Sequence, residues 1–391
     1  MSDTNVLCDS YQRSGTDLSE LKEVLTELDA MTSLKTVSTL DIELLSLDRR
    51  RVVDGKQIFK VFEPLEGEKN EVSIPCSVHK ILAPMMQETQ NNRLLLRIGG
   101  KIYFTSYELI STMATRVDLG GTGLFKPSNR RDAYIAELFG VNEKEVRLVM
   151  RNVGSVFKIY AMFSEDYARI PQTTLLEIIS RIKQELGAPV CRFWDVNHNR
   201  SFIQLDFPEK AKDFARVYGI SERIIPGLKL ETSDVGISSI RAVGTWSIGK
   251  GKACSDAYTR KHVGNIDLKE IMEKIDNQIF KRYERITKAL GGLLQIDVKE
   301  PKEAYYSVFK QINLEKIVGK RRMMKIVDLL SQQLNPKLSY TAYDLAKSIL
   351  ALPDTLKGLP KTVLRDLETK VLEAVFADYK EYENELINIA A

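Results

Sequence analysis

The stretch PGLKLETSDVGISSIRAVGTWSIGKGKACSDAYTRKHVG, residues 226–264, decides the fold that we expect for the rest of the chain. It contains two runs of alternating apolar and polar residues, 228–232 and 237–246, with Pro and Gly between and around them. This pattern is typical of β-strands separated by turns. A glycine- and lysine-rich connection then leads to the basic tripeptide Arg260-Lys261-His262. We therefore expect this segment to be part of a sheet and to contribute to a binding surface.

Hairpins and helices are predicted on both sides of this stretch. Three hairpins are indicated: RRRVVDGKQIFKVFEP with a turn at Asp54-Gly55, NRLLLRIGGKIYFTS with a turn at Gly99-Gly100, and residues 190–207. A strand is expected at 155–164. Apolar residues at helical spacing predict helices at 17–47, 107–116, 132–139, 142–150, 174–186, 211–218 and 266–290.

The fold class that follows is α+β. We expect a central, mostly antiparallel sheet built from hairpins, with helices packed against it and an all-helical C-terminal region in which 303–391 contains no strand. The predicted domains are an N-terminal helix and hairpin region at 1–90, an α+β core at 91–290 and a helical domain at 291–391.

Composition narrows the class of protein. The 391 residues are 43% hydrophobic and 28% charged, as in ordinary globular proteins, and no apolar run reaches the ~20 residues of a membrane span. The polar, acidic N-terminus does not resemble a signal peptide. The four Cys show no CxxC spacing, which favours reduced thiols over disulfides or a zinc site. We expect a cytoplasmic protein that does not associate with membranes.

Charge is distributed unevenly along the chain. Residues 1–50 carry ten acidic and five basic side chains, whereas 241–288 carry eleven basic and six acidic ones. The segment KIVGKRRMMK, residues 316–325, has five basic residues and no acid. A basic middle between acidic ends is compatible with binding of a polyanion, and equally with an ordinary solvated surface.

The sequence gives little support for a catalytic motif. The run GTWSIGKG at 244–251 resembles a phosphate-binding P-loop, but Gly251 stands where a Ser or Thr would hold Mg²⁺. Only three histidines are present, without a hydrolase, metalloprotease or paired-carboxylate signature. The sequence therefore predicts no catalytic residue, no metal site and no cofactor. It favours a non-enzymatic function over an enzymatic one.

Nucleic-acid binding has the better physical case. Single-strand binding needs cations that follow the phosphate backbone and aromatic rings that stack on bases. Aromatic residues near the basic clusters include Tyr160, Phe193, Phe202 and Tyr258, although most of them could equally fill the core. As the interface we predict Arg147, Arg151, Arg169, Arg241, Lys250, Lys252, Arg260, Lys261 and His262 for phosphates, with Trp194 and Trp246 for stacking.

Three short elements, in order, resemble those of a known family. MFSEDYARIP at 162–171, SDVG at 233–236 and RKHVG at 260–264, with an arginine pair at 147 and 151 upstream, are similar to the phage/plasmid-like proteins of the domain of unknown function family 932. The resemblance implies a domain of about 95–290 and an origin on a phage, prophage or plasmid. Action on DNA is suggested only by analogy with phage annealing proteins.

The leading hypothesis is a phage- or plasmid-associated protein of the bacterial cytoplasm that binds single-stranded DNA, promotes annealing in recombination or replication, and forms a homo-oligomer. One alternative is a structural or interaction protein, such as an assembly component or a host-defence factor, that does not bind nucleic acid. A second is a metal-dependent nucleic-acid enzyme whose site is assembled from distant residues such as Glu165, Asp166, Asp234 and His262.

Overall fold

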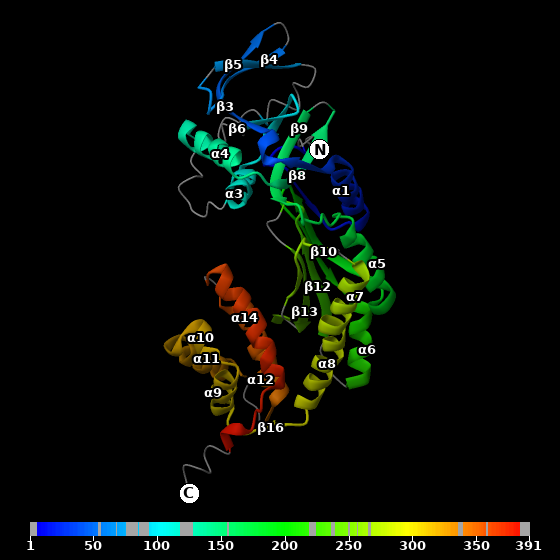
Figure 1. The fold of residues 1–391 in the computed structure, drawn as a ribbon. Coiled ribbons are helices and arrows are strands. Elements are labelled where there is room, and N and C mark those ends of the chain that lie inside the picture. The colour runs from blue at the N-terminus through cyan, green and yellow to red at the C-terminus, as the bar shows by residue number, and fades with distance from the viewer. Residues whose placement is uncertain are drawn as a thin grey trace.

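Two β-sheets and a cluster of C-terminal helices follow one another along the long axis of the molecule in the computed structural model (Figure 1). The structure describes residues 6–53, 56–67, 69–75, 85, 94–117, 128–154, 156–218, 224–235, 239–248, 251–255, 257–264, 267–334, 339–356 and 359–383. Within them the fold is α+β, with mostly antiparallel sheets and a helix-rich C-terminal region, as the sequence predicted.

Sheet A contains the stretch from which the prediction began. Its order is β1-β10-β11-β12-β13-β14, with β15 paired to β13, and every pair is antiparallel. The predicted hairpin at 190–207 is confirmed as β10 and β11. The strands are β1 (Gln12–Gly15), β10 (Val190–Asn197), β11 (Ser201–Asp206), β12 (Ile224–Thr232), β13 (Ile240–Ile248), β14 (Gly251–Cys254) and β15 (Tyr258–Arg260).

Sheet B lies at the other end of the β-rich part, in the order β2-β8-β9-β7-β6-β3-β4-β5. Only the β7–β9 pair among these strands is parallel. Gly99 and Gly100 form the predicted β6–β7 turn, with φ angles of 55° and 75° that favour glycine. The strands are β2 (Thr32–Ser38), β3 (Ile42–Val53), β4 (Lys56–Phe62), β5 (Lys69–Pro75), β6 (Leu94–Ile98), β7 (Lys101–Thr105), β8 (Glu145–Val153) and β9 (Val156–Ser164).

Helices cover the apolar faces of both sheets (Figure 1). On sheet B, α3 and α4 bury their apolar residues against the strands. Along one face of sheet A run α5, α6, α7 and α8, where Trp246 of β13 meets Tyr283 of α8 edge to face at 5.1 Å. The bounds are α1 (Leu18–Met31), η1 (Thr39–Asp41), α3 (Tyr107–Arg116), α4 (Asn129–Val141), α5 (Thr174–Leu186), α6 (Pro208–Tyr218), α7 (Leu268–Ile275) and α8 (Lys281–Leu293), with a π-helical turn, η4 (Asp276–Phe280), between the last two.

The C-terminal helices share the apolar core of sheet A, because their buried residues belong to the same cluster. A two-residue pairing of β16 (Asp297–Val298) with β17 (Tyr340–Thr341) links their beginning and middle. The helices are α9 (Pro301–Gln311), α10 (Glu315–Val318), α11 (Lys320–Gln333), α12 (Ala342–Leu350), α13 (Leu352–Thr355), α14 (Lys361–Glu373) and η5 (Ala374–Phe376).

Several sequence predictions need correction. The helix expected at 17–47 ends at Met31, because the β-branched run that follows pairs with β8 as strand β2. The helix expected at 142–150 is instead strand β8. Its pairing with β2 on one side and β9 on the other outweighs the helical spacing of its apolar residues. Residues 303–391 do contain strand β17. The boundary expected at residue 90 falls between β3 and β6, which pair in one sheet. The turn residues Asp54 and Gly55 lie outside the described residues.

None of the helices within the described ranges is long and apolar enough to cross a membrane.

The close packing of Gly227 on β12 leads to a test of this core. A Cβ at this position would lie 2.5 Å from Thr245 Oγ1 and 2.7 Å from the Leu205 carbonyl oxygen. The Leu205 carbonyl oxygen can move away only if the backbone shifts, which costs energy. Gly227→Ala should therefore lower the free energy of unfolding by about 1–3 kcal/mol in denaturant titrations. Gly292→Ala in α8 meets no atom within 4 Å and is the control: it should leave stability unchanged or raise it by up to about 1 kcal/mol.

Candidate functional site

The outer face of sheet A, opposite α5–α8, carries side chains that the alternation of the strands turns away from the core. We define this outer face by Phe193, Phe202, Lys229, Glu231 and Arg241. Phe202, Glu231 and Arg241 are neighbours across β11, β12 and β13. Their strand neighbours Ile203, Leu230 and Ala242 are fully buried on the other side. The face therefore combines aromatic rings with charged groups on a regular antiparallel frame.

An aromatic pair occupies the β10–β11 part of this face. The rings of Phe193 and Phe202 lie with their centroids 6.5 Å apart and their planes at 47°. Phe193 is 44% exposed, and Val190 on the same strand is 49% exposed. An exposed phenyl group beside a second one offers a platform on which a planar ligand can stack.

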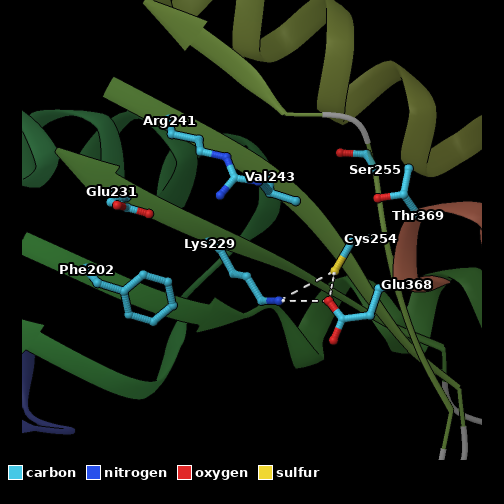
Figure 2. Close-up of a pocket in the computed structure, with 9 residues that line it drawn as sticks. All are labelled: Phe202, Lys229, Glu231, Arg241, Val243, Cys254, Ser255, Glu368 and Thr369. Carbon is cyan, nitrogen blue, oxygen red and sulfur yellow. Dashed lines mark hydrogen bonds and ion pairs between the residues drawn. The ribbon is translucent and has the colours of Figure 1, made fainter. Parts of the chain in front are cut away.

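Charged groups surround a small hollow of about 80 Å³ on the same face (Figure 2). Figure 2 shows Lys229 extending toward Cys254 and Glu368, with Arg241 and Glu231 on the side of the hollow nearer to Phe202. Lys229 also pairs with Glu368 of α14 at 3.4 Å, and Arg200 pairs with Glu231 at 3.9 Å. Both carboxylates are largely buried, with about a fifth of each side chain exposed, and each pair is longer than 3.3 Å.

Cys254 lines the end of the hollow that lies next to α14. Its thiol donates to Glu368 Oε2 at 3.1 Å, and Lys229 Nζ lies 3.5 Å from the sulfur. Burial raises the pKa of Cys254 to about 12, with Lys229 opposing the rise. The thiol is therefore protonated at neutral pH, so it acts as a hydrogen-bond donor that joins sheet A to α14 and not as a nucleophile.

The two tryptophans predicted to stack on bases are in the core. Trp194 and Trp246 have no exposed surface. The indole N–H of Trp194 donates to the Asp17 carbonyl oxygen at 2.9 Å, which fixes α1 to β10. Neither ring presents a face to a ligand in this structure, because inward-facing strand positions favour the largest apolar side chains.

Arg151, predicted to contact phosphate, is buried at the junction of the two sheets. Its Nη2 donates to Asp234 Oδ1 at 3.1 Å and its Nε donates to Thr32 Oγ1 at 3.2 Å. Its guanidinium lies 4.5 Å from the centroid of the Tyr160 ring, a cation–π contact. Burial disfavours the charge, but the adjacent Asp234 carboxylate holds the pKa of Arg151 above its usual value. The group is thus a permanent cation with an internal partner.

Three more predicted residues gather around the same junction. Arg169 pairs with Asp29, and its Nε lies 3.8 Å from Asp234 Oδ2. Arg147 Nη1 donates to the Tyr167 carbonyl oxygen at 2.5 Å. His262 is 6% exposed and stacks on the Tyr167 ring at 5.7 Å, with the planes at 6°.

The predicted interface residues are therefore divided between different places. Arg151 and Arg169 pair with Asp234 and Asp29, while Arg147 and His262 contact Tyr167, so these four residues meet inside the protein instead of lining an open groove. Arg241 belongs to the outer face of sheet A. Arg260 is half-buried at the end of β15 and Lys261 is exposed beside it. Lys250 lies outside the described residues, as does the side chain of Lys252. The described cations do not form the single continuous groove that the sequence suggested.

A group that could hold a metal ion lies at the other end of the junction. Asp9, Glu108 and His198 each place a ligand atom within 4.8 Å of the others. No sequence pattern could have found this group, because about 90 residues separate each member from the next. The carboxylates considered as catalytic in the sequence are elsewhere: Asp234 is bound to Arg151, and Glu165 and Asp166 are exposed in a turn after β9.

Comparisons of the chain with protein-family models, curated proteins and solved structures found no match. The resemblance to the phage/plasmid-like family therefore remains a prediction.

The buried pair Arg151–Asp234 should be far more important for stability than an exposed pair of similar length. Asp234→Asn leaves a buried guanidinium without its counter-charge, and we expect a loss of about 3–5 kcal/mol in the free energy of unfolding. In the exposed pair Lys302–Asp328, at 2.8 Å, Asp328→Asn is the matched control and should cost much less stability than Asp234→Asn, because solvent screens the pair. Equal losses of stability in the two variants would contradict the conclusion that the Arg151–Asp234 pair is the main polar contact between the two sheets.

His262 should make the fold sensitive to mild acid. Burial lowers the pKa of His262 below its ordinary 6.5, although Asp234 opposes the shift, so the unfolded chain takes up a proton at a higher pH than the folded chain does. Stability should therefore fall as the pH drops below about 6.5, until the folded-state pKa is reached. His262→Phe, which keeps an aromatic ring on Tyr167, should lose less stability than the wild type between pH 7 and pH 5. Urea titrations at several pH values measure this difference.

Proposed function

We propose that this chain is a phage- or plasmid-associated protein of the bacterial cytoplasm that binds single-stranded DNA on the outer face of sheet A. The observation that supports the proposal is the neighbouring pair Phe193 and Phe202 beside Arg241 and Lys229. Sheets with exposed aromatic residues and flanking cations are a recurrent solution to single-strand recognition. In this proposal Phe193 and Phe202 take the stacking role that the sequence analysis assigned to Trp194 and Trp246.

Stacking supplies affinity without strong sequence preference. Every base has a π-face, and each base–aromatic stack contributes roughly 1–3 kcal/mol. The phenyl rings, with Phe193 nearly half exposed and the centroids 6.5 Å apart, would receive successive bases of an extended strand. We therefore expect binding of any unpaired segment, which suits annealing in recombination or replication.

Cations around the face supply the electrostatic part. Arg241 and Lys229 lie within the hollow, and Arg200 is exposed at the hairpin end. A separate exposed basic group lies on α10 and α11 of the C-terminal helices and consists of Lys316, Lys320, Arg321, Arg322 and Lys325. Arginine and lysine that neutralise phosphates release counter-ions, so the affinity should fall steeply with salt.

Oligomer formation is part of the proposal, because annealing requires two strands to be held together. A homo-oligomer would extend the outer face of sheet A from one chain to the next, so that a longer strand is bound cooperatively.

Fluorescence anisotropy with a labelled single-stranded oligonucleotide, at low and moderate salt, tests the proposal. The double variant Phe193→Ala/Phe202→Ala should weaken binding by about 10-fold or more, since 1.4 kcal/mol corresponds to a factor of ten. Arg241→Gln should reduce the slope of log affinity against log salt by about 0.7.

Matched controls are available elsewhere on the surface. Tyr134→Ala on α4 removes a ring that is 45% exposed, and Lys183→Gln removes an exposed cation from α5. Neither should change the affinity. The proposal fails if single strands do not bind at low salt, or if the phenylalanine variant binds as the wild type does. Loss of self-association in that variant without any DNA binding would instead identify the outer face as a protein interface.

A further inference from the structure

Three segments meet around Asp9, Glu108 and His198, at the junction of the two sheets. Asp9 lies in the turn that precedes β1, Glu108 in the first helical turn of α3, and His198 at the tip of the β10–β11 hairpin. The three ligand atoms lie within 4.8 Å of one another, a spacing that one metal ion can bridge. Asn199, next to His198, donates to the same Glu108 oxygen at 2.8 Å.

Buried polar atoms in this group are unsatisfied. Glu108 Oε2, His198 Nδ1 and Asn199 Oδ1 are each inaccessible to solvent and have no hydrogen-bond partner among the residues that the structure describes. The His198 side chain is only 10% exposed. Buried carboxylate and imidazole atoms without partners are rare in folded proteins, because each loses its hydration without compensation. The unsatisfied atoms belong to two of the three residues that could hold a metal ion, and to Asn199 next to His198.

The charge of the group favours a cation. Glu108 Oε1 accepts a hydrogen bond from the Asn199 amide group and lies 3.2 Å from His198 Nε2. Asp9 is already held by Lys158 at 2.6 Å and by the Tyr107 backbone N–H at 3.2 Å. Two carboxylates therefore lie beside one ammonium group, and carboxylate oxygens are common ligands of divalent cations.

The Lys158 ammonium does not complete the group by itself. Lys158 Nζ donates to Asp9 Oδ1 at 2.6 Å, whereas the unsatisfied atoms belong to Glu108, His198 and Asn199. A carboxylate oxygen has more than one lone pair, so Asp9 can accept from Lys158 and still coordinate an ion. Lys158 would then orient Asp9 from the outer shell, as partners of metal ligands commonly do.

We propose that Asp9, Glu108 and His198 bind one divalent first-row transition metal ion, with the amide oxygen of Asn199 as a further ligand. Two carboxylates and an imidazole suit Mn²⁺ or Zn²⁺ better than Ca²⁺ or Mg²⁺, which prefer oxygen ligands alone. The ion ties the N-terminal segment to α3 on sheet B and to the β10–β11 hairpin of sheet A. Asp9 and Glu108 keep about a fifth of their side-chain surface exposed, which gives the ion a way in.

Titration of the full-length chain with Mn²⁺, after treatment with a chelator, tests this site. Mn²⁺ is the probe because it competes poorly for the free thiols that Zn²⁺ would also bind. Loss of the free-ion signal in electron paramagnetic resonance should show one bound ion per chain, and the melting temperature should rise with Mn²⁺ concentration.

Glu108→Gln and His198→Gln remove ligands and should each weaken Mn²⁺ binding by at least about 10–100-fold, while circular dichroism confirms the fold. His262→Phe removes the other buried imidazole at the junction and should leave Mn²⁺ binding unchanged. If the wild type binds no Mn²⁺, or if all three variants bind it equally, the site does not exist. Should a ligand variant not fold, the melting temperature of the wild type with and without Mn²⁺ still decides. This site does not depend on the proposed DNA binding.

Discussion

The buried ion pair between Arg151 and Asp234 is the constraint on which the arrangement of the two sheets depends. Arg151 belongs to β8 of sheet B, and Asp234 follows β12 of sheet A, so their contact fastens one sheet to the other. Gln172, which precedes α5, donates to the same Asp234 oxygen at 3.1 Å. The Tyr167 hydroxyl donates to the Asp234 backbone carbonyl at 2.8 Å. A charge removed from water is tolerable only with such partners, so the chain must bring these segments together in one way.

The same constraint positions the candidate surfaces. The β10–β11 hairpin carries Trp194 into the core, Phe193 onto the outer face and His198 into the junction. Within six residues, one side chain packs in the core, one lies on the outer face and one belongs to the polar group at the junction. Because strand side chains alternate and the hairpin tip is held by the junction, the orientation of the aromatic pair follows from the way the two sheets are joined. The hollow beside that pair is in turn closed by α14 through Glu368.

A dense set of arginines near a predicted strand does not by itself make a nucleic-acid surface. Arg147, Arg151 and Arg169 are close in sequence and also close in space, yet they bind carbonyl and carboxylate oxygens of the same chain. Acidic residues from positions 29 and 234 meet them, and no local pattern links those positions to the arginines. The outer face of sheet A keeps partly accessible cations, Lys229 and Arg241, although Lys229 also pairs with Glu368.

The sequence by itself determined most of the elements, because hairpin turns such as Gly99-Gly100 and amphipathic helices such as Thr174–Leu186 are encoded locally. It also identified 226–264 as sheet-forming and gave the α+β class. Only the tertiary structure decided that residues 145–153 are a strand, that both tryptophans are buried, and which arginines are neutralised internally. The Asp9–Glu108–His198 group was likewise invisible until the chain was folded. The physical reason is common to all of these: burial and ion pairing depend on residues far apart in the chain, whereas turns and helix periodicity depend on neighbours.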